Sequence, residues 1–244
     1  MKKKFKVKIN SAVKSPLNII ITVVLLLLVL NSCKRNVGEP IDLKHEYFPT
    51  EIGKWVIYDV VDIRHDINHD TFNYQIKEVI TADFLDNEGR LAQRVERFVR
   101  DSASLPWAIK DVWSSVRTTR TAEKIEEDER FLKMSFPIDF FKSWNGNVYN
   151  QQINWEYFFD SIDYQSTVGT FVFDSLVRVN QRTNYNVVEY EKAYEIYAKN
   201  IGLVEKILVD LDVRSGFSFD IPPVIDSIIK GNELYQVAID YGDN

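Results

Sequence analysis

The chain reads Gly-Lys-Trp-Val-Ile-Tyr-Asp-Val-Val-Asp-Ile from Gly53 to Ile63. β-Branched and aromatic residues predominate in this stretch, and such side chains fit the pleated surface of a β-strand. Pro49 and Gly53 place chain-breaking residues directly in front of it. The stretch therefore predicts a long strand that begins after a turn, and it indicates a β-rich fold for the residues that follow.

The same kind of signal recurs along most of the chain. Apolar and polar residues alternate from Phe72 to Lys77, which is the period of a half-buried strand. Asp86 to Gly89 is a hairpin signal, because Asp, Asn and Gly tolerate the backbone conformations of tight turns. Further strands are predicted over residues 91–100, 107–119, 155–164, 169–180, 185–190, 203–213 and 234–239. We expect an all-β, mainly antiparallel fold with few or no long helices, arranged as a curved sheet, a half-barrel or a sandwich.

Two segments are compatible with a helix as well as with strands. Residues 122–130 have helical propensity and many acids but lack an apolar stripe, so we favour two strands joined by an acidic turn, with the charges on a solvated surface. Residues 190–197 space several tyrosines as a helix would, yet Asn200 to Gly202 is typical of a hairpin loop and a strand signal follows it. We favour a hairpin there as well.

A weak internal repeat suggests how the β-rich region is organised. The stretch Phe136 to Trp144 repeats the pattern of Phe48 to Trp55, with one residue inserted before the tryptophan. Both copies open a new series of predicted strands. Residues 46–244 are therefore expected to form a single globular domain, with 46–135 and 136–244 as two similar halves.

The sequence upstream of this region has the parts of an export signal. Residues 1–32 contain six lysines and no acids, and the apolar run Ile19 to Leu30 has twelve residues. A bilayer core needs roughly 20 apolar residues, so the run is too short to cross one. The next residues, Leu30-Asn31-Ser32-Cys33, resemble the lipobox of bacterial lipoproteins. This resemblance implies a signal peptide over 1–32 that is cleaved before Cys33, and a lipidated tether over 33–45.

Membership of the lipoprotein class would fix the location of the protein. The resemblance implies a diacylglyceryl group on the sulfur of Cys33 and an acyl chain, typically palmitate, on its new amino terminus, and several chains hold a protein firmly to a membrane. Lys34 follows the cysteine in place of the aspartate that commonly retains lipoproteins at the inner membrane. We therefore expect an anchor in the outer membrane, with the periplasmic and the surface face both open.

The charge and the cysteine content exclude several classes of partner and cross-link. Without residues 1–32 the chain has 24 basic and 36 acidic residues, a formal charge of −12. Such a surface is not suited to nucleic acid or to anionic lipid headgroups. Cys33 is the only cysteine, so the mature chain can form no internal disulfide.

Few residues have the types and spacing of a catalytic or metal site. His65 and His69 would share one face of a helix and could bind zinc. They lie between two predicted strands, however, and Asp66 stands where a metalloprotease helix would have glutamate. Asp210 and Asp212 would point the same way on a strand, and we interpret them as a solvent-facing pair rather than a calcium site. We expect no cofactor and no resident metal.

Aromatic residues are abundant in the central part of the chain. They could form a platform for a sugar or a peptide if several were exposed, but large aromatic side chains more commonly fill β-sheet cores. The residues concerned are Trp107, Trp113, Trp144, Trp155, Tyr157, Phe158 and Phe159. We interpret most of them as core residues.

Two short motifs extend the resemblance to a function. Tyr47 to Trp55 and Tyr197 to Val204 resemble uncharacterised envelope lipoproteins and, more distantly, the half-barrel proteins that carry lipoproteins. Carriers also have helices that close over the barrel, and no such helix is predicted here. We expect a non-enzymatic lipoprotein with a binding or assembly role, whose partner is an envelope protein or an extracellular ligand. The alternatives are a periplasmic carrier of acyl lipid or lipoprotein, and a metal-dependent hydrolase that uses His65 and His69.

Overall fold

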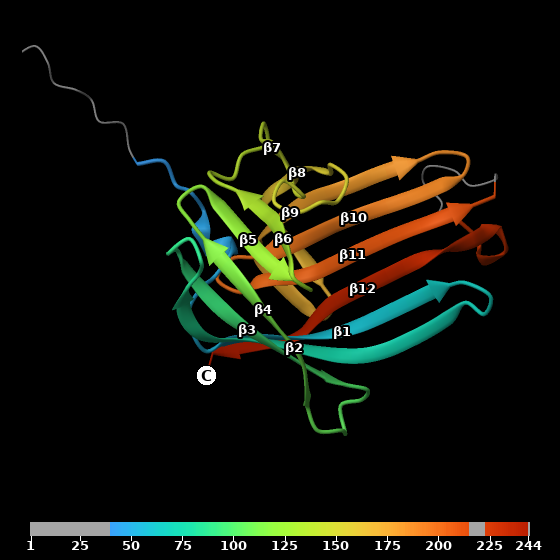
Figure 1. Cartoon of the computed structure of the whole chain (residues 1–244), viewed down its shortest axis with the longest axis horizontal. Coiled ribbons are helices and arrows are strands. Elements are labelled where there is room, and N and C mark those ends of the chain that lie inside the picture. Colours follow the sequence, from blue (N-terminus) through green and yellow to red (C-terminus); the bar gives the residue numbers. More distant parts are fainter. Residues whose placement is uncertain (1–39, 215–222, 244) are drawn as a thin grey trace, which may run out of the picture. The chain divides into compact units, whose positions relative to one another are not determined.

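The chain folds into one antiparallel sheet of 12 strands, in a computed structural model that describes residues 40–214 and 223–243 (Figure 1). The strands are β1 (Lys54–His65), β2 (Asp70–Leu85), β3 (Leu91–Arg100), β4 (Ala108–Arg117), β5 (Thr121–Glu126), β6 (Glu129–Ser135), β7 (Ser143–Asn145), β8 (Glu156–Val168), β9 (Phe171–Tyr185), β10 (Glu189–Ala198), β11 (Gly202–Val213) and β12 (Ile228–Asp243). The predicted all-β, antiparallel class is confirmed, and a single sheet is formed rather than a sandwich.

Helical structure is limited to two 3-10 turns in the described residues, η1 (His45–Tyr47) and η2 (Ile225–Ser227). Within residues 40–214 and 223–243, no helix has the length and apolar character needed to cross a membrane. The expectation of few or no long helices is therefore confirmed for this part of the chain.

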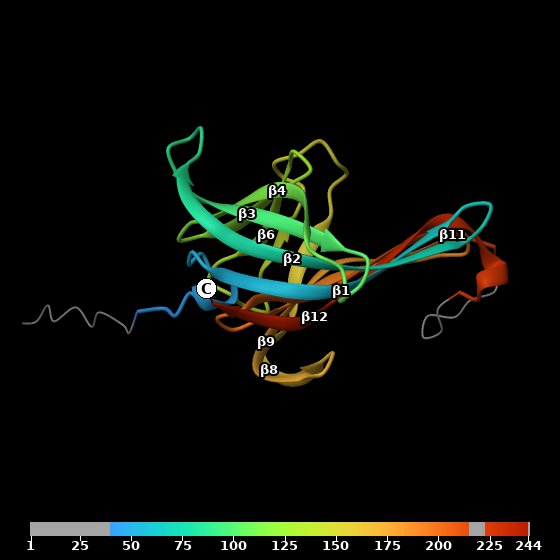
Figure 2. The ribbon, with the colours of Figure 1, turned by 90° about the horizontal axis from the view of Figure 1, so that it is seen from below.

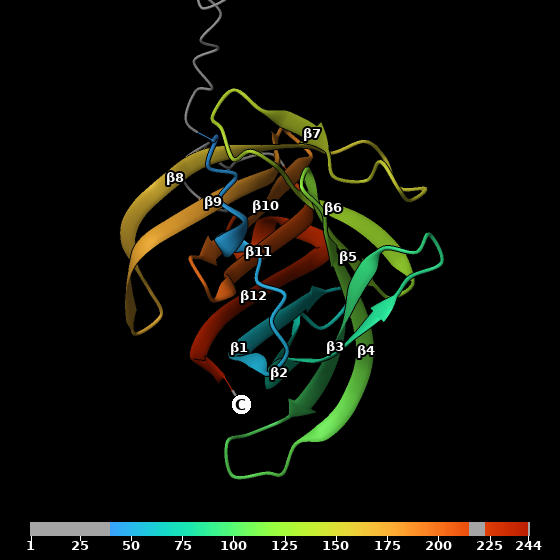
Figure 3. The same cartoon turned by 90° about the vertical axis from the view of Figure 1, so that its left-hand side faces the viewer.

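Strands that are consecutive in the sequence pair with each other, except β6 and β7, and β1 also pairs with β12. The sheet order is β6-β5-β4-β3-β2-β1-β12-β11-β10-β9-β8-β7, so five strands lie on each side of the β1–β12 pair. The sheet is strongly curved (Figures 2 and 3). The curvature brings the edge strands β6 and β7 together, where the Leu132 N–H donates to Gly146 O at 2.8 Å and the Trp144 indole N–H donates to Leu132 O at 2.9 Å. The result is a nearly closed barrel with a seam at β6 and β7.

Local sequence explains most of the turns. The Asp86 carboxylate accepts hydrogen bonds from the backbone N–H groups of Glu88 and Arg90, and Gly89 supplies the positive φ of 75° that closes the turn. The acidic turn predicted within 122–130 is also present. Glu127 and Asp128 both have positive φ, as a two-residue hairpin loop requires, and join β5 to β6.

The hairpin predicted around Asn200 is confirmed and consists of β10 and β11. The separate strand predicted at residues 185–190 is not formed. Residues 185–190 do not form a strand of their own, because β9 continues to Tyr185 and the chain then turns before β10 begins at Glu189. The Asn186 side-chain oxygen accepts from the N–H groups of Val188 and Glu189 at 2.9 Å, and this local bonding stabilises the turn. The β-branched residues of this segment are exposed in the turn.

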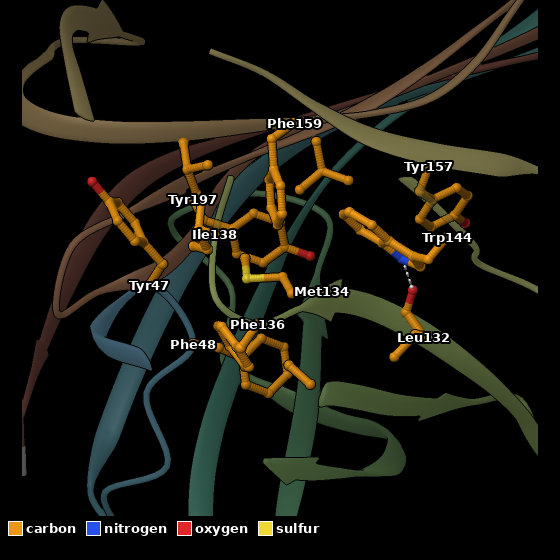
Figure 4. Close-up of a cluster of buried hydrophobic side chains, with 13 residues drawn as sticks. Tyr47, Phe48, Leu132, Met134, Phe136, Ile138, Trp144, Tyr157, Phe159 and Tyr197 are labelled. Atoms are coloured by element: carbon orange, nitrogen blue, oxygen red, sulfur yellow. Dashed lines mark hydrogen bonds between the residues drawn. The ribbon is translucent and has the colours of Figure 1, made fainter. Parts of the chain in front are cut away.

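Two large apolar clusters form the core. One gathers side chains from η1, β6, β7, β8 and β10 near the seam, and Figure 4 shows Trp144 lying between Tyr157 and Phe159. The other packs β1 and β2 against β9, β10 and β11. Burial of a large apolar side chain contributes about 1.5–3 kcal/mol relative to exposure. The clusters therefore supply much of the energy that keeps the sheet curved.

Candidate functional site

Four charged side chains meet inside the curve of the sheet, and we call them the interior ion cluster: Glu126, Lys133, Glu195 and Lys206. The Lys133 ammonium lies 3.0 Å from a carboxylate oxygen of Glu126 and 3.0 Å from one of Glu195. Lys206 lies 3.5 Å and 3.6 Å from the same two carboxylates. Two positive and two negative charges thus balance in a region that side chains largely shield from water.

The interior ion cluster holds fixed protonation states. Burial alone would raise the pKa of Glu126, but Lys133 and Lys206 outweigh it and hold that pKa well below the ordinary 4.5. Burial would lower the pKa of Lys133, yet Glu126 and Glu195 raise it above 10.5. Burial and Glu195 together raise the pKa of Tyr197, so its hydroxyl stays protonated and donates to Glu195 at 2.5 Å. General acid–base catalysis needs a group that titrates near the working pH, and the pKa values of Glu126, Lys133 and Tyr197 are all shifted away from that range.

A second buried network continues from the first, and we call it the Arg97 network. Arg97 lies 3.0 Å from Glu78 and 3.1 Å from Asp111, while its guanidinium stacks 3.4 Å from the centre of the Trp113 ring. Lys124 completes it, 2.8 Å from Glu78. Burial would raise the pKa of Glu78, but Lys124 and Arg97 lower it. The two networks line much of the interior of β2 to β6 with paired charges.

A small cavity of about 90 Å³ lies between these networks and the apolar core. Its walls include charged residues of both networks, among them Glu78, Lys124 and Lys133. Phe48 and Pro49, which follow η1, also line it. Ligand pockets for drug-sized molecules commonly enclose about 300–1,000 Å³. This cavity is therefore smaller than a typical ligand pocket.

The interior charges correct one sequence-based interpretation. The acids of residues 122–130 were expected on a solvated surface, yet Glu123 is 1% exposed and Glu126 belongs to the interior ion cluster. Glu123 is paired with Arg90 and Arg130, both at 3.1 Å. The alternation of strand residues explains the error, because β5 turns part of its acidic run inward. The arginines and lysines elsewhere in the chain, which pair with these acids, were the signal in the sequence for their burial.

The two histidines proposed as metal ligands are in contact. His65 Nδ1 and His69 Nδ1 are 2.8 Å apart, at the end of β1 and in the turn before β2. His65 Nε2 lies 2.7 Å from Glu233 of β12. Within residues 40–214 and 223–243, no group of three or more His, Cys, Asp or Glu side chains is arranged to hold a metal ion. The three protein ligands of a typical catalytic zinc site are thus not assembled in this part of the chain.

The remaining predicted sites have simpler roles. Asp212 forms an ion pair with Lys230 at 3.1 Å, and Asp210 is exposed, while Val209 and Leu211 on the other face are buried. This matches the expected solvent-facing pair. Cys33, the predicted lipidation residue, lies outside the described residues, so its lipidation stays a prediction.

The aromatic residues do not form an exposed platform. Trp144, Tyr157 and Phe159 are buried at the seam, and Trp155 packs against the same cluster. Trp107 and Trp113 are half-buried beneath the guanidinium groups of Arg100 and Arg97. Phe158 is the most exposed of the group, at 38%. The interpretation of most of these residues as core is confirmed.

One group of exposed apolar residues lies at one end of the sheet, which the sequence did not indicate. The turns after β1, after β9 and before β12 lie beside one another there. Val213 N–H donates to Val188 O at 2.8 Å, Arg214 N–H donates to Ser227 O at 2.7 Å, and Gly231 pairs with His65. We call this end the distal tip, and its exposed apolar residues are Ile67, Val187, Val188, Val224, Ile225 and Ile229.

The opposite end of the sheet receives the chain from its N-terminal side. Asn200 N–H donates to Glu46 O at 2.7 Å, and the Arg117 guanidinium donates to the backbone oxygens of His45 and Phe48. Tyr47 is fully buried and donates to Asp163 at 2.5 Å. We call this the proximal end.

Comparison of the chain with protein-family models, with curated proteins and with solved structures found no match. The geometry of the structure is therefore the basis for a functional assignment.

Proposed function

We propose that this protein is an outer-membrane lipoprotein, anchored through Cys33, whose β domain has a non-catalytic binding or assembly role. The anchor rests on the lipobox-like stretch Leu30 to Cys33. The binding role rests on the distal tip, where six apolar side chains in and beside three turns are exposed together.

The distal tip is placed well for contact with a partner away from the membrane. The 3-10 turn η1 lies at the proximal end, and β11 alone spans 12 residues between the two ends, about 40 Å at 3.3 Å per residue. Figure 1 shows the blue ribbon of η1 at one end of the strands and the turns of the distal tip at the other. Exposed fractions of 94% for Ile67, 71% for Val187 and 67% for Val224 leave much apolar surface to cover. We propose an envelope protein as the partner.

The interior favours this role over lipid transport. A carrier of acyl chains needs an open apolar cavity, whereas the cavity beside the two charged networks is about 90 Å³ and has charged walls. Opening it would separate the paired charges of the interior ion cluster, which is costly for buried ions. The fixed protonation states of that cluster likewise favour a structural role over a catalytic one.

Photo-crosslinking in intact cells tests the proposal. A photoreactive residue at Val188 or Ile225, both exposed at the distal tip, should yield one discrete adduct with an envelope protein. The same residue at Thr170, exposed in the turn between β8 and β9 at the proximal end, is the matched control and should not. Cys33→Ser should move the protein out of the outer-membrane fraction. Identical adducts from all positions, or membrane retention of C33S, would overturn the proposal.

A further inference from the structure

The turn between β1 and β2 holds two of the three histidines of the chain in direct contact. Their Nδ1 atoms are 2.8 Å apart, and the ring planes meet at 63°. Two imidazole nitrogens at this distance share one hydrogen, so one of them donates and the other offers a lone pair. If the shared hydrogen moved to another atom, both Nδ1 atoms would offer a lone pair, and the two lone pairs could bind one metal ion.

The surroundings assign the hydrogen. Glu233 accepts at 2.7 Å from His65 Nε2, which fixes the hydrogen of His65 on Nε2 and leaves its Nδ1 as the acceptor. The shared hydrogen therefore belongs to His69 Nδ1. Glu233 is itself held in place by a hydrogen bond from the Tyr235 hydroxyl. A carboxylate that accepts from the far nitrogen of an imidazole is the usual second layer of a histidine–metal site, where it orients the ring and raises its basicity.

The backbone of the turn positions the second ring. His69 has a φ of 52°, in the left-handed region that residues with a side chain adopt rarely. With this backbone conformation, the His69 ring lies against the ring of His65. His65 itself is buried, with 5% of its surface exposed. Asp66, Ile67 and Asn68 are exposed, so water reaches the turn from outside. One ligand is thus rigid and buried, while the other lies on a segment that solvent reaches.

We propose that His65 Nδ1 and His69 Nδ1 bind one divalent transition-metal ion of the zinc type, with water completing its coordination. Zinc–nitrogen distances of about 2.0–2.1 Å place two tetrahedral ligands about 3.3 Å apart, so the rings need to separate by about half an ångström. His69 exchanges its hydrogen from Nδ1 to Nε2 through solvent. Two neutral histidines therefore bind the ion with no net release of protons.

The expected affinity follows from the number of ligands. A four-ligand zinc site binds far more tightly, and a site with two protein nitrogens is expected to have a dissociation constant on the order of micromolar. Protons compete for the same nitrogen atoms, so acidification weakens binding. The site is independent of the proposed docking role, although it lies within the distal tip.

Zinc titration of the full-length protein, in detergent and without a histidine tag, tests the proposal. Equilibrium dialysis at pH 7.5 should find one bound Zn²⁺ per chain, and nitrogen-15 NMR should show the His69 hydrogen moving from Nδ1 to Nε2. His69→Asn keeps a residue that tolerates the left-handed conformation and should weaken binding at least tenfold. Glu233→Gln should weaken it about tenfold, since it removes the orienting carboxylate.

His45 provides the control, because it is the remaining histidine and lies at the proximal end. His45→Asn should leave zinc binding unchanged. No stoichiometric binding at 100 μM Zn²⁺, a figure about a hundredfold above a micromolar dissociation constant, would overturn the proposal. So would equal binding by H69N and the unaltered protein.

Discussion

The ammonium group of Lys133 lies 3.0 Å from the carboxylate of Glu195, although their strands, β6 and β10, are not neighbours in the sheet. The pair crosses the interior and links the seam edge to the opposite wall. Both side chains are almost completely buried, at 4% and 1% exposure. An ion pair in this position depends on the curvature of the sheet and in turn fixes it.

Loss of one partner from this pair should be strongly destabilising. Lys133→Met leaves Lys206 alone to balance the buried carboxylates of Glu126 and Glu195, so one negative charge becomes uncompensated, and such changes cost about 3–5 kcal/mol. Lys230→Met removes an ion pair with Asp212 that is largely exposed, and should cost less than about 1 kcal/mol. Urea unfolding of both variants gives the comparison. Similar losses from the two changes would contradict the role assigned to Lys133.

Acid should unfold the protein through its buried glutamates. Burial opposes ionisation of Glu78, Glu126 and Glu195, but the neighbouring lysines hold their pKa values below the ordinary 4.5. A lowered folded-state pKa contributes stability above the ordinary value, and this contribution is lost as the pH falls through the folded-state value. The urea midpoint should therefore decrease steadily below about pH 4.5. Glu126→Gln should be less stable at pH 7 and lose less on acidification; an unchanged slope would argue against the assignment.

A methyl group at Gly231 should not fit. A Cβ there would lie 2.1 Å from the Asp210 carbonyl oxygen and 2.8 Å from Leu211 Cα, both backbone atoms, and the φ of 137° is unfavourable for any side chain. Gly231→Ala should cost on the order of 3 kcal/mol or more. Gly89→Ala meets open space and only the positive φ, so about 1–2 kcal/mol is expected. Thermal unfolding of the two variants measures the difference, and equal shifts would refute it.

The seam should open when its indole donor is removed. Trp144→Phe keeps an aromatic ring in the core but deletes the hydrogen bond to Leu132 O, and a lost bond of this kind costs about 1–3 kcal/mol. Amide hydrogen exchange at Leu132, whose N–H donates to Gly146 O, should become faster. Trp107→Phe, which alters a half-buried ring outside the seam, should leave that exchange rate unchanged. Equal protection of Leu132 in both variants would show that the indole does not hold the edges together.

Local sequence patterns predicted the strands and most turns, because alternation and turn residues act over a few positions. The strand expected at 91–100 is β3 with the same limits, and the acidic hairpin at β5 and β6 follows from the same reasoning. The segment 185–190 failed because Asn186 bonds to its own backbone neighbours and overrides the β propensity of Val187 and Val188. Strand propensity alone does not detect such a turn.

The interior sites depend on distant residues, and local patterns do not reveal them. Lys133 and Glu195 are 62 residues apart in the chain, so the periodicity of each strand gives no sign that they meet. His65 and His69 could be singled out by residue type, whereas the Glu233 that orients them is 168 residues away. The distal tip likewise exists because three turns, separate in the sequence, end at the same level of the sheet.

The pairing of β1 with β12 has a consequence for the order of folding. Lys54 pairs with Asp243, so β1 acquires its second neighbour when the last strand has been synthesised. Until then the hydrogen-bonding groups on one side of β1 stay open, and an open strand edge is a template for association with other chains. Closure over so long a loop also has a large entropic cost. Vectorial synthesis therefore leaves the nascent chain with an aggregation-prone edge at its centre, and shielding by a chaperone would be most effective before β12 arrives.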